Sequence, residues 1–157
     1  MQRLILMRHA EAERAAGSGR DRDRVLSSRG RIDAAAMGRA LAARGMRPDL
    51  AVVSPAARTL QTWDLLHDAF GDVQVRADEP LYNGGSDILR RFVEAAEDEA
   101  GCLMVVAHNP GVHLLAMEYM GNPRGDRPNS SPVSAYSRSN FATLQPRSAR
   151  SLGWVSI

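Results

Sequence analysis

The sequence has little of what several classes of protein require. Cys102 is its only cysteine, which excludes an intramolecular disulfide framework and a cysteine-rich zinc site. The longest apolar runs, Leu4–Met7 and Leu103–Ala107, are much shorter than the roughly 20 residues that cross a bilayer, so we expect no membrane span. Only four apolar residues lie between Arg3 and Arg8, too few for a secretory signal, and we therefore expect a cytoplasmic protein.

Lysine is absent, so all 20 basic residues are arginine, and aromatic residues make up only 5% of the chain. The net charge of +2 is unevenly distributed, because residues 1–31 and 120–157 are basic whereas residues 32–119 are acidic. A nucleic-acid reader normally combines one basic face with interleaved aromatic residues, so we expect no nucleic-acid partner. The length and the 44% hydrophobic content predict one compact domain over residues 1–157.

Short apolar runs alternate with amphipathic segments along most of the chain. The runs have the length of buried strands, and the amphipathic segments begin at helix caps and end near glycines. The predicted strands are residues 4–7, 50–53, 73–75 and 102–107, with weaker candidates at 141–144 and 152–155. The predicted helices begin at Ser27 or Ser28, Ser54, Ser86 and Asn109, and they end near Gly45, Gly71, Gly101 and Gly121. The polar segments 10–26 and 121–139 are predicted to be surface loops.

Two of the predicted helices start with the same signal, a capping residue followed by proline at the first helical position. These starts are Ser54-Pro55 and Asn109-Pro110, and each follows a predicted strand directly. The helix after Ser27 or Ser28 is predicted to bury one apolar face, made of Ile32, Ala36, Met37, Ala40 and Leu41.

Alternating strands and helices predict an α/β fold with three layers, in which a largely parallel sheet carries helices on both faces. Ligands bind to such sheets just beyond the carboxyl ends of the strands. That rule selects three segments, namely Arg8-His9, Ser54 with Arg58, and His108-Asn109. We expect them to meet at one edge of the sheet.

Two arginines, two histidines and two helix amino ends at one edge form a site for a dianionic phosphoryl group. One imidazole can attack phosphorus as a nucleophile while the other donates a hydrogen bond. The nearby guanidinium groups of Arg8 and Arg58 disfavour a charged imidazole, so His9 is expected to be neutral at pH 7. The pattern therefore predicts an enzyme.

The same segments resemble the motifs of the histidine phosphatase superfamily. Arg8-His9-Ala10 after its apolar strand resembles the Arg-His-Gly/Ala signature of the superfamily, and Ser54 to Thr62 resembles its Ser-Pro-x-x-Arg-x-x-x-Thr helix start. Val105 to Pro110 resembles its second histidine motif. Asp23 to Gly30 is similar to a segment of the small, cap-less branch, the SixA-type phosphohistidine phosphatases. These matches are ordered over residues 1–120, which chance seldom produces.

This resemblance implies a phosphoglycerate mutase-like fold and a metal-independent phosphatase without cofactors. It implies that His9 is the nucleophile, which becomes phosphohistidine, and that Arg8, Arg58 and His108 hold the phosphoryl oxygens. Arg24 and Asn109 are the candidate substrate-binding residues. The substrate class that it implies is phosphohistidine on a partner protein, which suits the open site of a cap-less chain.

The motifs do not place the general acid. Asp78, Glu79 and Asp87 precede or begin the third predicted helix, and of these we favour Glu79. Two alternative functions stay open: a phosphatase or mutase of the same superfamily for small phosphoesters, and a non-catalytic module that binds phosphorylated ligands. His67 and His113 lie on predicted helices outside the motifs, where we expect structural roles.

Overall fold

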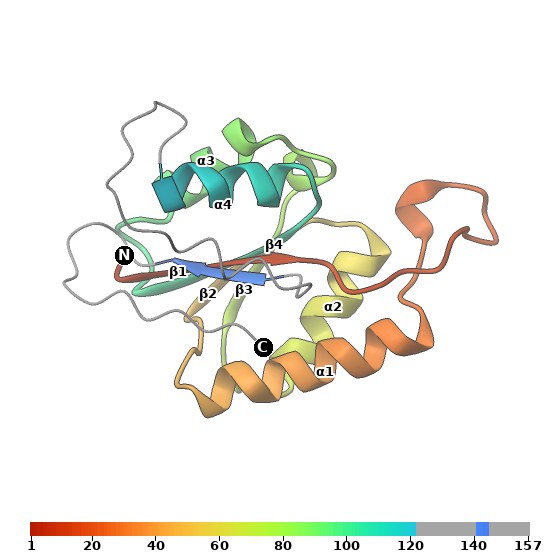
Figure 1. Ribbon diagram of the computed structural model, residues 1–157, viewed down its shortest axis with the longest axis horizontal. Helices are drawn as coiled ribbons and strands as arrows, with labels where there is room; N and C mark the ends of the chain where they lie inside the picture. Colours follow the sequence, from red (N-terminus) through yellow and green to blue (C-terminus); the bar gives the residue numbers. More distant parts are fainter. Residues whose placement is uncertain (122–140, 145–157) are drawn as a thin grey trace.

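A five-stranded sheet forms the centre of the computed structural model, which describes residues 1–121 and 141–144 (Figure 1). The strand order is β3-β2-β4-β1-β5. The strands are β1 (Arg3–Arg8), β2 (Leu50–Val53), β3 (Gln74–Ala77), β4 (Cys102–Ala107) and β5 (Phe141–Leu144). The first four are parallel and β5 runs antiparallel to β1, so the predicted largely parallel sheet is confirmed.

Helices cover both faces of the sheet. They are α1 (Ser28–Ala43), α2 (Ala57–His67), α3 (Ser86–Ala95) and α4 (Gly111–Gly121). In Figure 1, α3 and α4 lie above the sheet while α1 and α2 lie below it. Two short 3-10 helices, η1 (Asp21–Asp23) and η2 (Glu79–Leu81), complete the described helices, none of which is long and apolar enough to cross a membrane.

Alternation along the buried strands divides the core into two layers. In β1, Leu4 and Leu6 pack into the cluster that includes Leu89 of α3, and Ile5 and Met7 pack into the opposite cluster with α1 and α2. This alternation follows from the two-residue period of a strand. Because both faces are covered by helices, all four of these side chains are almost fully buried.

The helix starts at Ser54 and Asn109 were predicted wrongly. Helix α2 begins at Ala57 and its N-cap residue, Ala56, makes no side-chain capping hydrogen bond. Helix α4 begins at Gly111. The hydroxyl of Ser54 contacts a histidine at the sheet edge and does not cap the helix, which is information that a capping pattern cannot supply.

The buried face of α1 is only partly the predicted one, since Leu41 is buried and Met37 packs against the core. The cap at Ser27 is confirmed, since its hydroxyl oxygen accepts from the Gly30 amide at 3.0 Å. Ile32, however, is 69% exposed, and small residues such as Gly38 face α2 instead. A Cβ at Gly38 would lie 2.9 Å from the Leu66 carbonyl oxygen. The close approach of α1 to α2 therefore requires glycine at this position, which a pattern of large apolar residues does not indicate.

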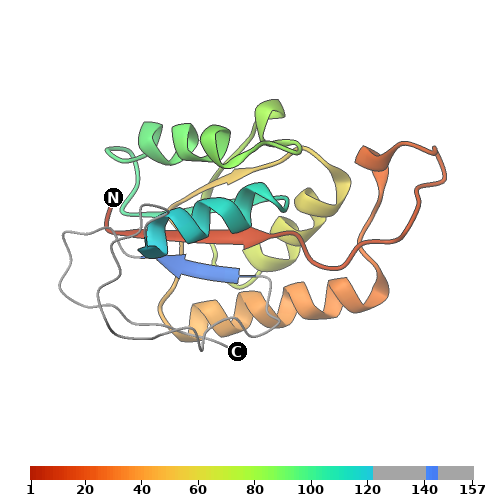
Figure 2. The same ribbon diagram turned by 45° about the horizontal axis from the view of Figure 1, so that its top comes forward.

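Smaller boundary differences occur elsewhere. Strand β3 extends to Ala77, α3 ends at Ala95, and Ser86 is its first helical residue, not its cap. The loop between β1 and α1 contains η1 and extends beyond the carboxyl ends of the strands (Figure 2). The predicted strand 152–155 lies outside the described residues, as does the predicted loop 121–139 apart from Gly121.

Candidate active site

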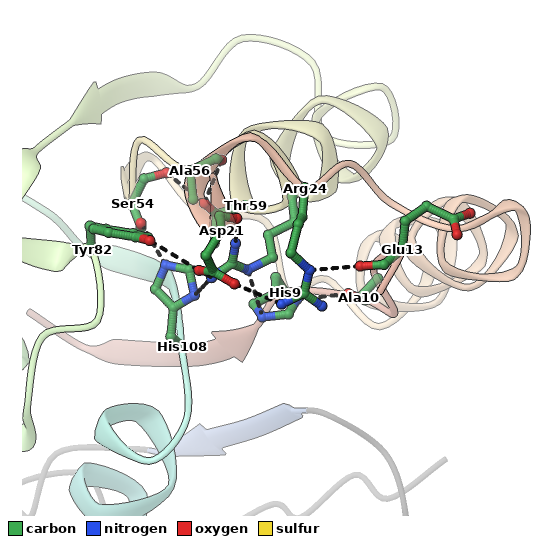
Figure 3. A network of polar contacts seen from close by, with 11 residues as sticks. His9, Ala10, Glu13, Asp21, Arg24, Ser54, Ala56, Thr59, Tyr82 and His108 are labelled. Atoms are coloured by element: carbon green, nitrogen blue, oxygen red, sulfur yellow. Dashed lines mark hydrogen bonds and ion pairs between the residues drawn. The ribbon is translucent and has the colours of Figure 1, made fainter. Parts of the chain in front are cut away.

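The strand register brings the predicted site residues together. Arg8 is paired with Ala107 in the sheet, so the residues that follow them, His9 and His108, become neighbours. The imidazole centroids of the two histidines are 5.3 Å apart (Figure 3). The Ser54 amide donates to the Val106 carbonyl at 2.9 Å, which places Ser54 at the same edge.

The hydrogen bonds of His9 define its tautomer. Its Nδ1 lies 2.8 Å from the carbonyl oxygen of Ala10, which can only accept, so Nδ1 carries the hydrogen. Its Nε2 accepts from Nε of Arg58 at 3.2 Å. The lone pair of His9 is therefore on Nε2, on the side that faces the guanidinium group.

His9 is neutral at pH 7, as expected, but for a different main reason. Its pKa is lowered from 6.5 to about 4, chiefly by burial, and further by the positive charges of Arg58, Arg8 and Arg24. The hydrogen bond to Ala10 acts in the opposite direction. Burial removes the hydration that a charged ring needs, so it outweighs the arginines on which the sequence argument relied.

Arg58 connects the two histidines with the loop between β1 and α1. Its side chain is 4% exposed on the first turn of α2. Besides its bond to His9, its Nη1 donates to the Asp21 backbone carbonyl at 2.8 Å and its Nη2 to Asp21 Oδ2 at 3.0 Å. Nη2 also lies 3.4 Å from Nδ1 of His108. The planar guanidinium thus fixes several partners at once, which a lysine could not do.

Arg8 holds an unused hydrogen-bond donor. Its Nε is buried and has no hydrogen-bond partner among the residues that the structure describes. The charge of Arg8 lowers the pKa of both His9 and His108. A buried, unpaired donor of a cation is costly unless an anion satisfies it, so this side of the site favours an anionic ligand.

His108 is the more deeply buried of the two imidazoles, with 2% of its surface exposed. Its Nε2 lies 2.7 Å from the hydroxyl oxygen of Ser54. Burial, followed by the charge of Arg58, lowers its pKa from 6.5 to about 3. The ring of Tyr82 packs edge-on against it, with centroids 5.6 Å apart. His108 is therefore neutral and held by contacts on two sides.

The loop supplies a carboxylate that the sequence analysis missed. Asp21 accepts hydrogen bonds from Arg58, from Arg24 at 2.8 Å and from the Tyr82 hydroxyl at 3.0 Å. These bonds, above all the one from Arg24, lower the pKa of Asp21 to about 2. The alternating Asp and Arg residues of this loop resemble a solvated charge run, and the motif in this part of the chain begins only at Asp23, so no sequence signal pointed to Asp21.

The two predicted substrate-binding residues differ in how the structure connects them with the site. Nε of Arg24 donates to the Glu13 carbonyl at 2.7 Å, and its charge acts on His9. Asn109 is exposed and directly follows His108. The structure therefore gives Arg24 an electrostatic link to His9.

Glu79, the favoured proton donor, is held in an ion pair with Arg22. Its two carboxylate oxygens accept from Arg22 at 2.6 and 2.8 Å, and this interaction lowers the pKa of Glu79. The side chain is 67% exposed. A carboxylate held in this way is ionised at neutral pH, so it must leave Arg22 and gain a proton before it can act as an acid.

No group of three or more His, Cys, Asp or Glu side chains among the described residues is arranged to hold a metal ion. Beside the hydroxyl of Ser54 and the carboxylate of Asp21, the polar groups that converge at the sheet edge are mainly guanidinium and imidazole groups. Such donors bind and polarise an anion.

A family comparison agrees with this arrangement. The model of the histidine phosphatase superfamily (branch 1) matches residues 4–85, just over half of the chain. The chain belongs to the histidine phosphatase superfamily.

Solved structures point to the same branch. A protein assigned as phosphohistidine phosphatase SixA from Agrobacterium tumefaciens is 33% identical, with a TM-score of 0.72 over 78% of this chain and 79% of its own. A second SixA assignment, from Nakamurella multipartitia, is 33% identical with a TM-score of 0.73, over 90% of this chain and 83% of its own. These relatives confirm the SixA-type fold and support a phosphatase, a hydrolase.

The match to a curated protein covers much less of the chain than these structures do. An uncharacterised chloroplast protein of Arabidopsis thaliana is 44% identical over 61 residues. These residues make up 39% of this chain and only 28% of the length of that relative.

Proposed function

We propose that this protein removes the phosphoryl group from phosphohistidine on a partner protein, through a covalent phosphohistidine on His9. One observation carries the proposal. The neutral imidazole of His9 has its Nδ1 hydrogen held by Ala10 and its Nε2 lone pair directed at Arg58. This is the protonation state and orientation that a nitrogen nucleophile needs beside a phosphoryl site.

In the first step, Nε2 of His9 attacks phosphorus and a new N–P bond forms. The bond from phosphorus to the substrate imidazole breaks, and the leaving nitrogen keeps the bonding electrons and takes a proton from solvent water. Arg8, Arg58 and His108 bind the phosphoryl oxygens. The Nε–H of Arg58, which donates to Nε2 of His9 in the free protein, then donates to one of these oxygens instead. Positioning and electrostatic stabilisation of this kind supply most of the catalysis in phosphoryl transfer.

In the second step, water attacks phosphorus and releases a proton to solvent, the N–P bond breaks and inorganic phosphate leaves. His9 recovers its lone pair on Nε2. While the ring carries the phosphoryl group it gains positive character, and the hydrogen bond from Nδ1 to the Ala10 carbonyl stabilises that charge.

The substrate class is supported by the relatives. The two proteins with 33% identity are assigned as phosphohistidine phosphatases. A SixA protein of 21% identity, which shares the fold, was solved with tungstate, a tetrahedral oxyanion. Arg24, whose charge acts on His9, and the exposed Asn109 are proposed to contact the partner protein.

Trapping the intermediate tests the mechanism. Wild-type protein mixed with a radiolabelled phosphohistidine peptide and quenched in base should carry an acid-labile, base-stable phosphate, whereas His9→Ala should carry none. His67→Ala is the matched control, because His67 lies on α2 against Trp63, outside the site, and should label like the wild type. Turnover by His9→Ala at the wild-type rate would overturn the mechanism.

Steady-state assays test the substrate class. We expect a higher kcat/KM for the phosphohistidine peptide than for sugar phosphates. The reverse order would indicate a phosphatase or mutase for small phosphoesters. Tight binding of the peptide without any turnover would indicate a phospho-ligand-binding module.

A further inference from the structure

Ser54 and His108 form a buried pair at the sheet edge. The hydroxyl oxygen of Ser54 lies 2.7 Å from Nε2 of His108, and the exposed fractions of the two residues are 0% and 2%. The pairing of Val53 with Val106 places Ser54 just beyond the end of β2, next to β4, which ends before His108. Since Ser54 does not cap α2, its hydroxyl needs another explanation.

A serine hydroxyl can either donate to an imidazole nitrogen or accept from it. Among the described residues, the hydrogen bonds give Ser54 Oγ one partner, Nε2 of His108. If Nε2 carried the ring hydrogen, the hydroxyl hydrogen of Ser54 would be buried without an acceptor, which is unfavourable. If Nε2 is bare, the hydroxyl donates to it and these two groups are satisfied, while the Nδ1 hydrogen is left to be accepted by a bound anion.

Arg58 opposes this arrangement only weakly. Its Nη2 lies 3.4 Å from Nδ1 of His108 and, being a donor, would favour a bare Nδ1. That distance is near the limit of a hydrogen bond, whereas 2.7 Å is optimal for one to a hydroxyl. Nη2 also already donates to Asp21 at 3.0 Å. The contact with Ser54 therefore decides the tautomer.

We propose that Ser54 is a positioning residue whose hydroxyl donates to Nε2 of His108 and so keeps the hydrogen of the neutral ring on Nδ1. The inference rests on the proposed function, in which His108 binds a phosphoryl oxygen. Nδ1 is on the side of Arg58, which also contacts His9. A neutral His108 in this tautomer donates to the phosphoryl oxygen without first gaining a proton.

Nitrogen NMR of the full-length, ¹⁵N-histidine-labelled protein tests the tautomer directly. The chain has four histidines, so the His108 signals are assigned with His108→Gln. At pH 7 with inorganic phosphate, we expect a protonated Nδ1 and a bare Nε2 in the wild type. A protonated Nε2, alone or together with Nδ1, would overturn the proposal, and this spectrum requires no Ser54 variant.

Variants supply the second measurement. Ser54→Ala should lower the Nδ1–H signal and reduce kcat about 10- to 100-fold with a smaller change in KM, as for lost groups that orient a functional side chain. Ser54→Thr, which keeps a hydroxyl, should restore the Nδ1–H signal. Thr59→Val is the matched control, since it removes a neighbouring buried hydroxyl that bonds to the Ser54 carbonyl and not to His108.

The wild-type tautomer in Ser54→Ala would contradict the proposal, as would a loss of the Nδ1–H signal in Thr59→Val. The spectra do not depend on turnover. A His9→Ala variant that stays active would overturn the proposed function and leave the tautomer result standing, so the two failures are distinguishable.

Discussion

The active site has two halves that are built differently. The strand-end half consists of Arg8, His9, Ser54 and His108, which follow or end β1, β2 and β4. The loop half consists of Asp21, Arg22, Arg24, Glu79 and Tyr82, on the segments that contain η1 and η2. Ser54 and His108 are buried, whereas the side chains of Asp21 and Glu79 are 48% and 67% exposed.

This difference separates the groups that perform the chemistry from those that adjust it. The sheet fixes the positions of the imidazoles through backbone hydrogen bonds, and burial sets their pKa values. The loop half acts through exposed charges, whose interactions are screened by water and salt. Substitutions in the strand-end half should therefore reduce activity strongly, and those in the loop half should alter it modestly.

Among the substitutions that compare the two halves, the largest effect is expected at Arg58, which contacts both. In Arg58→Lys, one ammonium group cannot contact His9 and Asp21 together, so kcat/KM for a phosphohistidine peptide should fall about 100-fold or more. Arg24→Lys, the matched change in the loop half, should cost less than about tenfold. Steady-state kinetics of both variants measure these losses of kcat/KM. Equal losses would show that the two halves do not differ in their contribution to catalysis.

The burial of His108 predicts an acid-sensitive contribution to stability. Its pKa is about 3 in the folded protein and 6.5 ordinarily, so below pH 6.5 the unfolded chain binds a proton that the folded one does not. Stability is therefore lost as the pH falls from 6.5 toward 3, by up to about 1.4 kcal/mol per pH unit.

Comparison with His108→Gln isolates this contribution. Between about pH 8 and about pH 5, the free energy of unfolding of the wild type should fall by about 2 kcal/mol more than that of the variant. Urea titrations at several pH values measure the difference. A constant difference across this range would show that His108 is not buried as a neutral ring.

The strand-end half could be predicted because short stretches of sequence determine its strands and the residues at their ends. Short apolar runs predicted β1, β2 and β4, and the rule that ligands bind at carboxyl ends selected Arg8, His9 and His108. The parallel pairing of the strands then leaves little freedom in where the side chains after them lie, since the end of a strand determines the position of the next residue. Ser54 was selected too, but its role depends on a partner 54 positions away, which a capping pattern cannot reveal.

The loop half could not be predicted for the opposite reason. The polar segment 10–26 has no periodicity, and its conformation is set by long-range ion pairs such as Arg22 with Glu79 and Arg58 with Asp21. Several arrangements of these exposed charges have similar energies. The same limit affected α1, where contact with α2 through Gly38 determined which face is buried.

Asp21 should oppose anion binding in the loop half. Its carboxylate, ionised at neutral pH because its pKa is about 2, sits against Arg58 and Arg24. In Asp21→Asn, the inhibition constant of inorganic phosphate should fall about three- to tenfold, since a nearby negative charge is removed. Asp23→Asn is the control, because Asp23 binds Ser18 and Arg20, and it should leave the constant unchanged. Weaker phosphate binding in Asp21→Asn would show that Asp21 serves mainly to orient Arg58.

The smallest effect is expected at Glu79. An obligatory general acid contributes at least about 100-fold to the rate, whereas Glu79 is an exposed carboxylate bound by Arg22 with a lowered pKa. Glu79→Gln should slow hydrolysis of an alkyl phosphate about threefold, and of a phosphohistidine peptide less, because an alkoxide needs a proton more than imidazole does. Asp78→Asn and Asp87→Asn, assayed alongside, complete the set of candidate donors. A loss above about 100-fold on both substrates for Glu79→Gln would place the proton donor in the loop half, and the chemistry would then be shared between the two halves.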